Sequence, residues 1–325
     1  MELSIGTFNL NNLFSRFNFR FRAEVDGLEE GAVDITAVRT LADPEDQRVV
    51  TYEGRVVKKK PAAARKKIAE RIRSIDVDVL AVQEVEDIDT LRYFARNELG
   101  APGLYPHVVL IEGNDPRLID LAVLSKYPIG AATSWQHAVH PDEPKDRVFS
   151  RDLLEVEILD HARRKRLCTV YNNHLKSHFV AFFEDQGAGA AAANERRRRQ
   201  AETVARIVKD RTRPNSAYAV LGDMNDPPGS DALAPLVADA RPELVNGLAE
   251  PTETRPAPAD DPPPASTAWT HRFKPARQPA RYELFDQVWL SPSLAGRQVG
   301  SWVDRRTKLG GDGSDHDPAW VVIDL

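Results

Sequence analysis

The sequence contains almost no cysteine, and this scarcity limits the classes of protein to which it can belong. Its 325 residues include one cysteine, Cys168, so an intramolecular disulfide and a cluster of thiolate metal ligands are both excluded. Cys168 lies in the apolar run LCTVY, which predicts a core residue rather than a nucleophile.

The sequence also lacks a long apolar run. No stretch is long enough to span a bilayer, and the amino-terminal MELSIGTFNL has neither the basic nor the apolar region of a secretory signal. We therefore expect a cytoplasmic protein without stable membrane association, and a monomer by default.

An excess of positive charge is missing as well. The formal net charge is −5, so any binding of nucleic acid must come from local basic patches rather than from an overall field. The hydrophobic fraction of 42% is sufficient for a sizeable core and excludes disorder throughout the chain.

Short apolar runs of strand length occur along the whole chain and predict the fold class. The predicted strands are Leu3–Phe8, Val77–Val82, His107–Ile111, Ile119–Leu124, Leu153–Ile158, Leu167–Tyr171, Ala217–Leu221, Phe285–Leu290 and Trp320–Ile323. Helical patterns are fewer and cover Pro61–Ser74, Asn194–Arg211 and Asp231–Ala238. Many strands with few helices predict an α/β protein, a four-layer α/β sandwich of two packed mixed β-sheets flanked by helices.

We expect a single domain over residues 1–325, with inserts at about 13–60, 179–194 and 251–265. The first insert ends in a basic cluster from Lys58 to Lys67 and contains FSRFNFRFR, whose aromatic rings could stack on bases, although a β-hairpin is the simpler explanation. The second contains GAGAAAAN, a composition typical of a flexible segment, and the third is proline-rich, which favours a stiff surface loop.

Polar residues stand at one end of six predicted strands. They are Asn9, Glu84, His174, Asp223, Asn225, Asp286, Asp315 and His316. Taken singly, each has a structural explanation: asparagines form turns, Asp and Asn cap helices, and EVED could be a solvated loop or a helix N-cap. Strand ends converge at the rim of a sheet sandwich, however, so the scaffold could aim these side chains at one point. In LGDMND the crowded carboxylates require solvent, a hydrogen-bond network or a cation to offset their repulsion.

The order of these motifs resembles the endonuclease/exonuclease/phosphatase superfamily. The matching segments, from residue 8 to 318, are FNLNN, AVQEVED, IDLAVLSKYPI, NNHLKS, LGDMND, FDQVWLS and GSDHDP. That superfamily contains type I deoxyribonucleases, exonuclease III-like repair nucleases, neutral sphingomyelinases and inositol polyphosphate phosphatases. The resemblance covers nearly the whole chain and implies phosphoester hydrolysis by an activated water, with one or two divalent cations, usually Mg²⁺, which Mn²⁺ could replace.

The resemblance implies a metal site with Glu84 as the principal ligand, Asn9 in support and Asp315 on the other side. Oxygen ligands of this kind suit Mg²⁺. One departure from the repair nucleases is Asn11, which stands where an acidic residue often follows the first metal-site asparagine, and this weakens the case for a second metal contact.

The resemblance assigns catalytic roles to His174, Asp223, Asn225, Asp286 and His316. Asp286 would hold the His316 imidazole in its tautomer, and Asp223 would position or deprotonate the attacking water. Asn225 and His174 would donate hydrogen bonds to the phosphoryl oxygens, or His174 would protonate the leaving group. Arg147, Arg151 and Lys176 are candidates for binding the substrate phosphate, although a surface role explains them equally well.

These observations favour a metal-dependent nuclease that acts on DNA or RNA. The alternative is a phosphatase or phosphodiesterase for a small or lipid phosphoester, such as an inositol phosphate or a sphingomyelin-like molecule. A binding module that has lost catalysis is the weakest hypothesis, because all the motif residues are present.

Overall fold

The structure is a computed structural model that describes residues 1–14, 17–23, 33–39, 55–57, 59–100, 103–180, 185–238, 243–260 and 262–325. Most of the insert predicted at 13–60 lies outside the described residues, including Arg16 and Lys58. No helix in the described part of the chain combines the length and the apolarity needed to cross a membrane.

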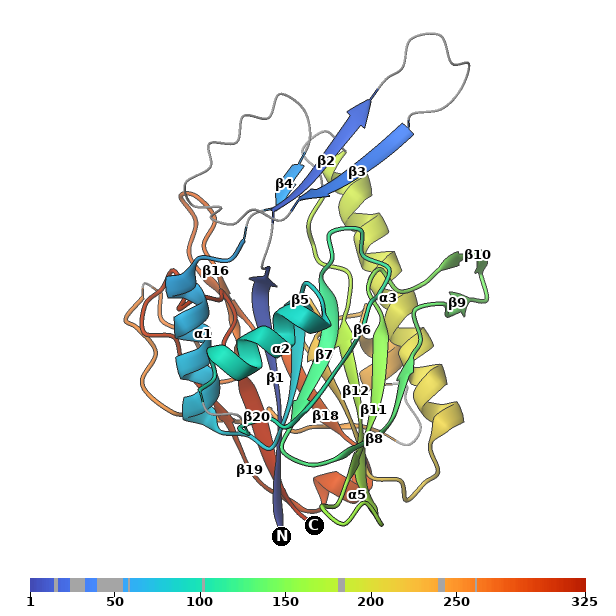
Figure 1. Cartoon of the computed structure of the whole chain (residues 1–325), viewed down its shortest axis with the longest axis vertical. Coiled ribbons are helices and arrows are strands. Elements are labelled where there is room, and N and C mark those ends of the chain that lie inside the picture. Colours follow the sequence, from blue (N-terminus) through green and yellow to red (C-terminus); the bar gives the residue numbers. More distant parts are fainter. Residues whose placement is uncertain are drawn as a thin grey trace.

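Two large mixed sheets form the body of the protein (Figure 1). The first contains, in spatial order, β15 (Thr252–Glu253), β19 (Gln298–Val303), β20 (Ala319–Asp324), β1 (Glu2–Leu13), β5 (Val79–Val85), β7 (Asp120–Ser125) and β6 (His107–Ile111). The second contains β14 (Val245–Asn246), β18 (Asp286–Leu290), β13 (Tyr218–Asp223), β12 (Arg166–His174), β11 (Leu153–Leu159) and β8 (Ile129–Ser134). Within each sheet the central pair is parallel, β1 with β5 and β12 with β13.

Three small sheets and five helices complete the described structure. The small sheets pair β9 (Val139–His140) with β10 (Glu143–Arg147), β16 (His271–Phe273) with β17 (Arg281–Glu283), and β2 (Phe17–Ala23) with β3 (Val33–Arg39) and β4 (Arg55–Val57). The helices are α1 (Ala62–Ile75), α2 (Ile88–Asn97), α3 (Gln186–Arg211), α4 (Ala234–Val237) and α5 (Pro292–Ala295).

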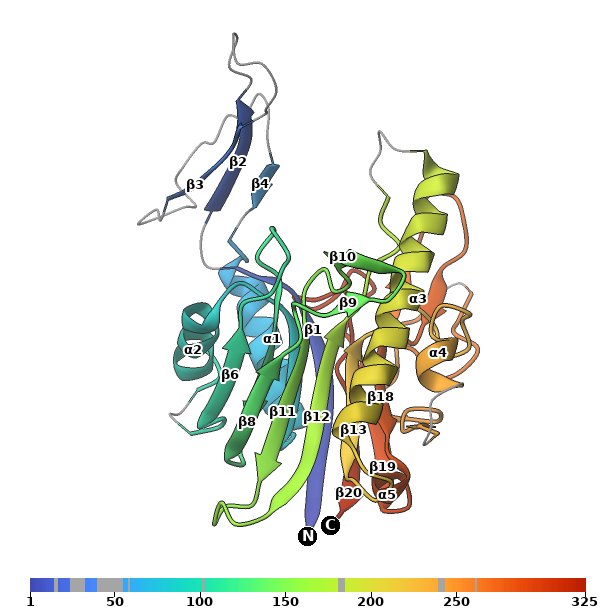
Figure 2. The same ribbon diagram turned by 90° about the vertical axis from the view of Figure 1, so that its right-hand side faces the viewer.

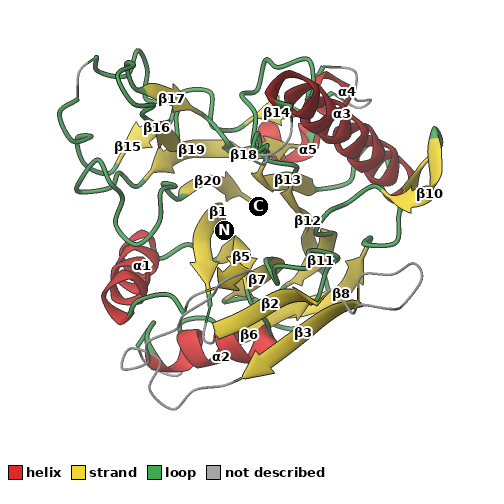
Figure 3. Ribbon diagram, turned by 90° about the horizontal axis from the view of Figure 1, so that it is seen from above, coloured by secondary structure: helices red, strands yellow, loops and turns green. Residues whose placement is uncertain are grey.

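The strand periodicity builds four layers. On β5, Val79 and Ala81 pack between the two sheets, whereas Leu80 and Val82 face α1 and α2. On β13, Leu221 faces the other sheet and Val220 faces α3 and α4. The helices therefore cover the two outer faces, as Figures 2 and 3 show. This confirms the predicted four-layer α/β sandwich.

Every predicted strand is present, and the additional elements include β8, β19 and α2. Asp87 of EVED caps α2 by accepting a 2.7 Å hydrogen bond from the backbone N–H of Thr90. Cys168 is buried in the core, as expected.

Two segments correct the sequence interpretation. The segment GAGAAAAN is helical: it lies inside α3, which begins at Gln186, because Asp185 caps the helix and alanine favours it. The proline-rich segment is not wholly a loop, since it contributes β15 to the edge of the first sheet. The helix predicted at Asp231–Ala238 is the shorter α4.

Asp152, at the start of β11, leads to a prediction on stability. Its Oδ1 accepts 2.8 Å hydrogen bonds from the backbone N–H groups of Trp135 and Leu153, and burial raises the pKa of Asp152 to about 7. The folded state therefore holds this proton more tightly than the unfolded chain, in which the pKa is about 3.9. The resulting stabilisation is complete below about pH 4 and is lost as the pH rises to 7.

We expect Asp152→Asn to remove this pH-dependent component. The slope of the unfolding free energy between pH 4 and 7 should change by up to about 1.4 kcal/mol per pH unit. Urea unfolding at several pH values measures this slope, and a slope equal to that of the wild type would contradict the assignment.

Candidate active site

The polar strand ends meet at one end of the sandwich. In the second sheet His174, Asp223 and Asp286 occupy one row, because His174 pairs with Asp223 and Asp223 pairs with Asp286 on neighbouring strands. Gly222 allows this close approach: its φ is 130°, and a Cβ there would collide with the carbonyl oxygen of Asn173. The row is thus a consequence of strand register.

In the first sheet a bulge places Glu84 at the same rim. The pairing of β5 with β7 shifts between Gln83 and Val85, and Glu84 has a φ of 64°, which is uncommon for a residue with a side chain. Gln83 remains between the sheets, where its Nε2 donates a 2.7 Å hydrogen bond to Asn172. The bulge therefore sends two consecutive side chains to different places: Gln83 lies between the sheets, and the Glu84 carboxylate lines the pocket.

Asp223 is the buried centre of the site. Its Oδ2 accepts a 2.9 Å hydrogen bond from Asn9 Nδ2 and lies 3.5 Å from His174 Nε2 and 3.9 Å from His316 Nε2. Burial raises the pKa of Asp223, while the positive charge of His316 opposes that change. The carboxylate thus has two imidazole groups and an amide around it.

His316 forms a close pair with Asp286. His316 Nδ1 lies 2.6 Å from Asp286 Oδ2, and both side chains are buried. Burial alone would lower the pKa of His316, but the carboxylates of Asp286 and Asp223 raise it well above its usual value. In contrast, burial and the nearby Arg151 hold the pKa of His174 well below its usual value. The two histidines therefore differ in charge near neutral pH.

Glu84, Asp315 and Asn9 offer the oxygen atoms of a metal site. Loss of water contact raises the pKa of Glu84 and the neighbouring Asp315 carboxylate raises it further, whereas the positive charges of His316 and Arg151 oppose that change. Glu84 Oε2 accepts a 2.9 Å hydrogen bond from the backbone N–H of Asn12. Asn11 Nδ2 donates a 2.7 Å bond to Asp315 Oδ1. This donor set fits a divalent cation such as Mg²⁺ or Mn²⁺.

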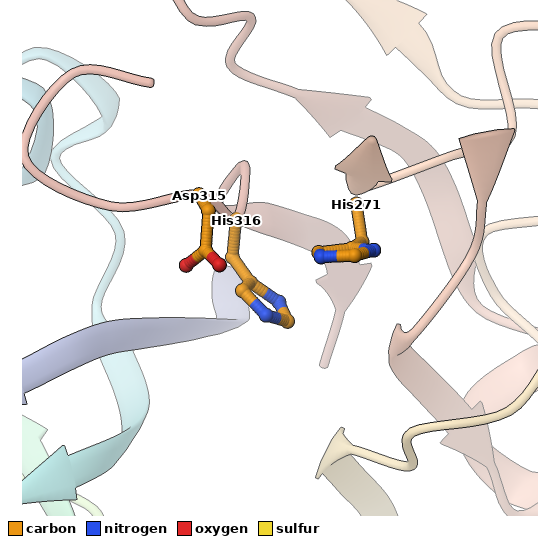
Figure 4. Close-up of side chains that lie close together, drawn as sticks. All are labelled: His271, Asp315 and His316. Atoms are coloured by element: carbon orange, nitrogen blue, oxygen red, sulfur yellow. The ribbon is translucent and has the colours of Figure 1, made fainter. Parts of the chain in front are cut away.

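His271 is a neighbour of this site that the sequence interpretation missed. His271, Asp315 and His316 each bring a potential ligand atom within 4.8 Å of the others (Figure 4). Burial lowers the pKa of His271 to about 4, so its imidazole is neutral near pH 7. The only sequence signal was an isolated histidine in THRF, far from the recognised motifs.

Most of these residues line a pocket of about 830 Å³ whose lining also includes three arginines, Arg117, Arg151 and Arg281. Arg151 is buried, with its Nε 3.2 Å from Asp115 Oδ2. Arg117 binds the same carboxylate through Nη2 at 2.8 Å. Arg117 was missed, because it belongs to an irregular segment without a recognised motif.

Two predicted phosphate contacts do not line this pocket. Arg147 instead donates a hydrogen bond to Asn114 on the exposed β10 side. Lys176 Nζ donates to the carbonyl oxygens of Ser177 and Phe179, at 2.9 Å each. Both cations are held by oxygen atoms of the protein and do not line this pocket, which does not support a contact with the substrate phosphate.

The described part of the basic cluster Lys58–Lys67 is largely paired within the protein. Arg65 binds Glu98, Lys67 binds Glu70, and the buried Lys60 donates to the carbonyl oxygen of Asn11. Burial lowers the pKa of Lys60 to about 8. These three contacts therefore take up part of the positive charge of the cluster.

The sequence profile of the endonuclease/exonuclease/phosphatase family matches residues 6–316. The chain belongs to this family. Members of the endonuclease/exonuclease/phosphatase family are phosphoester hydrolases and generally depend on divalent metal ions. A comparison with curated protein sequences finds no match.

Several solved structures share this fold. An AP endonuclease from Archaeoglobus fulgidus is 18% identical, covers 99% of this chain and 100% of its own, and has a TM-score of 0.56. A truncated TDP2 from Caenorhabditis elegans is 13% identical, with 100% and 98% covered and a TM-score of 0.54. A mannosyl-6-phosphatase from Bacteroides thetaiotaomicron is 14% identical, with 99% and 100% covered and a TM-score of 0.54. At these identities the similarity shows the fold and leaves the substrate open.

Proposed function

We propose that this family member is a divalent-metal-dependent nuclease that hydrolyses phosphodiester bonds of DNA or RNA with an activated water. The observation that supports this best is the surroundings of Asp223, a buried carboxylate between two histidines of different charge. It faces a pocket whose lining includes the carboxylates of Glu84 and Asp315 and the guanidinium groups of Arg151 and Arg117. Such a site can bind a phosphate and a cation together.

Glu84, Asp315 and Asn9 would hold the metal ion. When bound, a divalent cation polarises a phosphoryl oxygen and neutralises the negative charge that develops on it. The guanidinium groups of Arg151 and Arg117 would bind the remaining phosphate oxygens, because guanidinium matches phosphate geometry.

The protein's own residues would then accept the proton of the attacking water and stabilise the charge that develops on the phosphoryl group. Asp223 would orient the attacking water and accept its proton, and Asn9 holds the Asp223 carboxylate in place through its 2.9 Å hydrogen bond. His316, fixed by Asp286, would donate a hydrogen bond to the phosphoryl oxygen. Neutral His174 and Asn225 would be further donors; the Asn225 side chain is held by a 3.2 Å bond to the carbonyl oxygen of Leu175.

Removal of divalent metal should abolish activity. We expect excess EDTA to stop hydrolysis and Mg²⁺ or Mn²⁺ to restore it, because without a cation the Glu84 and Asp315 carboxylates repel both each other and the substrate phosphate. Initial rates before and after chelation, then after adding back metal, measure the effect. Activity that persists in excess chelator would contradict the metal assignment.

The nuclease proposal is tested by offering several phosphoesters to the metal-loaded protein. The substrates are supercoiled plasmid, linear duplex, single-stranded DNA, RNA and a small sugar phosphate. Cleavage of a polymer by the wild type supports a nuclease, and the products distinguish endonuclease from exonuclease action. Hydrolysis of the sugar phosphate alone would replace it with a small-molecule phosphatase.

A further inference from the structure

The hairpin of β16 and β17 forms one wall of the pocket. His271 lies opposite Glu283, and Phe273 lies opposite Arg281, in an antiparallel register. All four line the pocket, whereas Arg272, between His271 and Phe273, does not. Because successive side chains of a strand alternate between its faces, the register alone presents this face to the substrate.

Aromatic rings continue this wall beyond the hairpin. The Phe285 ring stacks on the His271 ring with centroids 5.0 Å apart and planes at 11°, and it stacks on His178 at 5.9 Å and 25°. Phe179 and Phe273 also line the pocket, yet 66% and 54% of their surfaces are exposed to solvent. Exposed apolar rings beside a polar site are typical of a ligand contact.

We propose that this aromatic wall binds an unpaired nucleobase next to the scissile phosphodiester; this inference rests on the proposed function. Only a base that has left its own stack can stack on an aromatic side chain of this wall. Glu283 supplies a carboxylate acceptor for exocyclic amino groups, and Arg281 supplies donors for ring nitrogen and carbonyl oxygen. A sugar without a base offers no flat face to these rings.

A matched pair of polymers isolates the base. One is a single-stranded oligodeoxynucleotide, and the other has the same length and backbone but carries abasic tetrahydrofuran units throughout. The measurement is kcat/KM for each, with Mg²⁺, and the ratio of the two values. We expect wild type to favour the base-bearing strand and this ratio to fall about tenfold in Phe273→Ala, the size of one base–aromatic stack.

Two further variants complete the design. Phe285→Leu keeps an apolar side chain but removes a flat ring from the wall. Tyr93→Ala removes a ring that is 61% exposed and does not line the pocket, so it should leave the ratio unchanged.

Each remaining outcome overturns the proposal in a recognisable way. Equal kcat/KM values of the wild type for both polymers would contradict the base-binding site, whereas the proposed phosphodiesterase activity would still hold. A ratio of the two kcat/KM values that is unchanged in both Phe273→Ala and Phe285→Leu would also contradict the base-binding site. Cleavage of neither polymer would overturn the base site, and it would overturn the nuclease as well if plasmid, duplex DNA and RNA are also left intact.

Discussion

Replacing Asp223 by asparagine is expected to lower kcat for phosphoester hydrolysis by about 10³-fold, within the range that a positioned acid or base contributes. Asparagine has nearly the same shape and can still accept the hydrogen bond from Asn9 Nδ2. It cannot accept a proton from water, and it removes the negative charge beside His316 and His174. The loss should therefore be in catalysis rather than in folding.

Single-turnover rates at saturating metal and substrate measure this effect, and circular dichroism checks the fold. Asp231→Asn is the matched control, because Asp231 is exposed and does not line the pocket of Asp223. A variant at position 223 that keeps more than about a tenth of the wild-type kcat would show that another group accepts the proton.

The second large effect is expected on stability, from Asp317→Ala. Asp317 is fully buried. Its carboxylate accepts hydrogen bonds from Arg71 Nη2 at 2.9 Å, Arg306 Nε at 3.1 Å and Arg305 Nη1 at 3.4 Å. Truncation would leave these buried guanidinium groups short of a counter-charge, which typically costs about 3–5 kcal/mol. Because Asp317 directly follows His316, we also expect the segment that carries His316 to shift and activity to fall.

Urea unfolding compares this variant with Asp324→Ala. Asp324 pairs with the amino terminus at the surface, where 67% of its side chain is exposed, so its removal should change stability little. A loss of less than about 1 kcal/mol for Asp317→Ala would mean that Asp304 and the other acceptors can satisfy the arginines without it.

The layered fold could be predicted because its information is local. Val79 to Val82 alternates between two cores, and a run of this kind reads as a buried strand wherever it lies in the chain. The elements that were missed have weak local signals. β8 has the sequence IGAATS, with few large apolar residues, and it is a strand because β11 pairs with it.

The candidate site could be predicted mainly where a residue belongs to a recognised motif, and Arg151 is the exception. Asp223 and His316 are brought together, as expected, although 93 positions separate them in the numbering from 223 to 316. Arg147 and Arg151 look alike in the sequence, yet Arg151 is buried in the pocket and Arg147 binds Asn114 elsewhere. Because the chain between these two arginines is irregular, their spacing of four positions does not predict the direction in which either long side chain points.

Periodicity and motif order in the amino-acid sequence were thus enough for the sandwich, the family and the chemistry expected at its rim. The shape of the pocket depended on long-range pairing. His271 and Phe273 face the pocket because β16 pairs with β17 in one register, and the buried Arg151 is held there with its Nε 3.2 Å from Asp115 Oδ2. The local sequence around each of these residues does not predict such contacts, because the direction of a side chain is set by the packing of the whole chain.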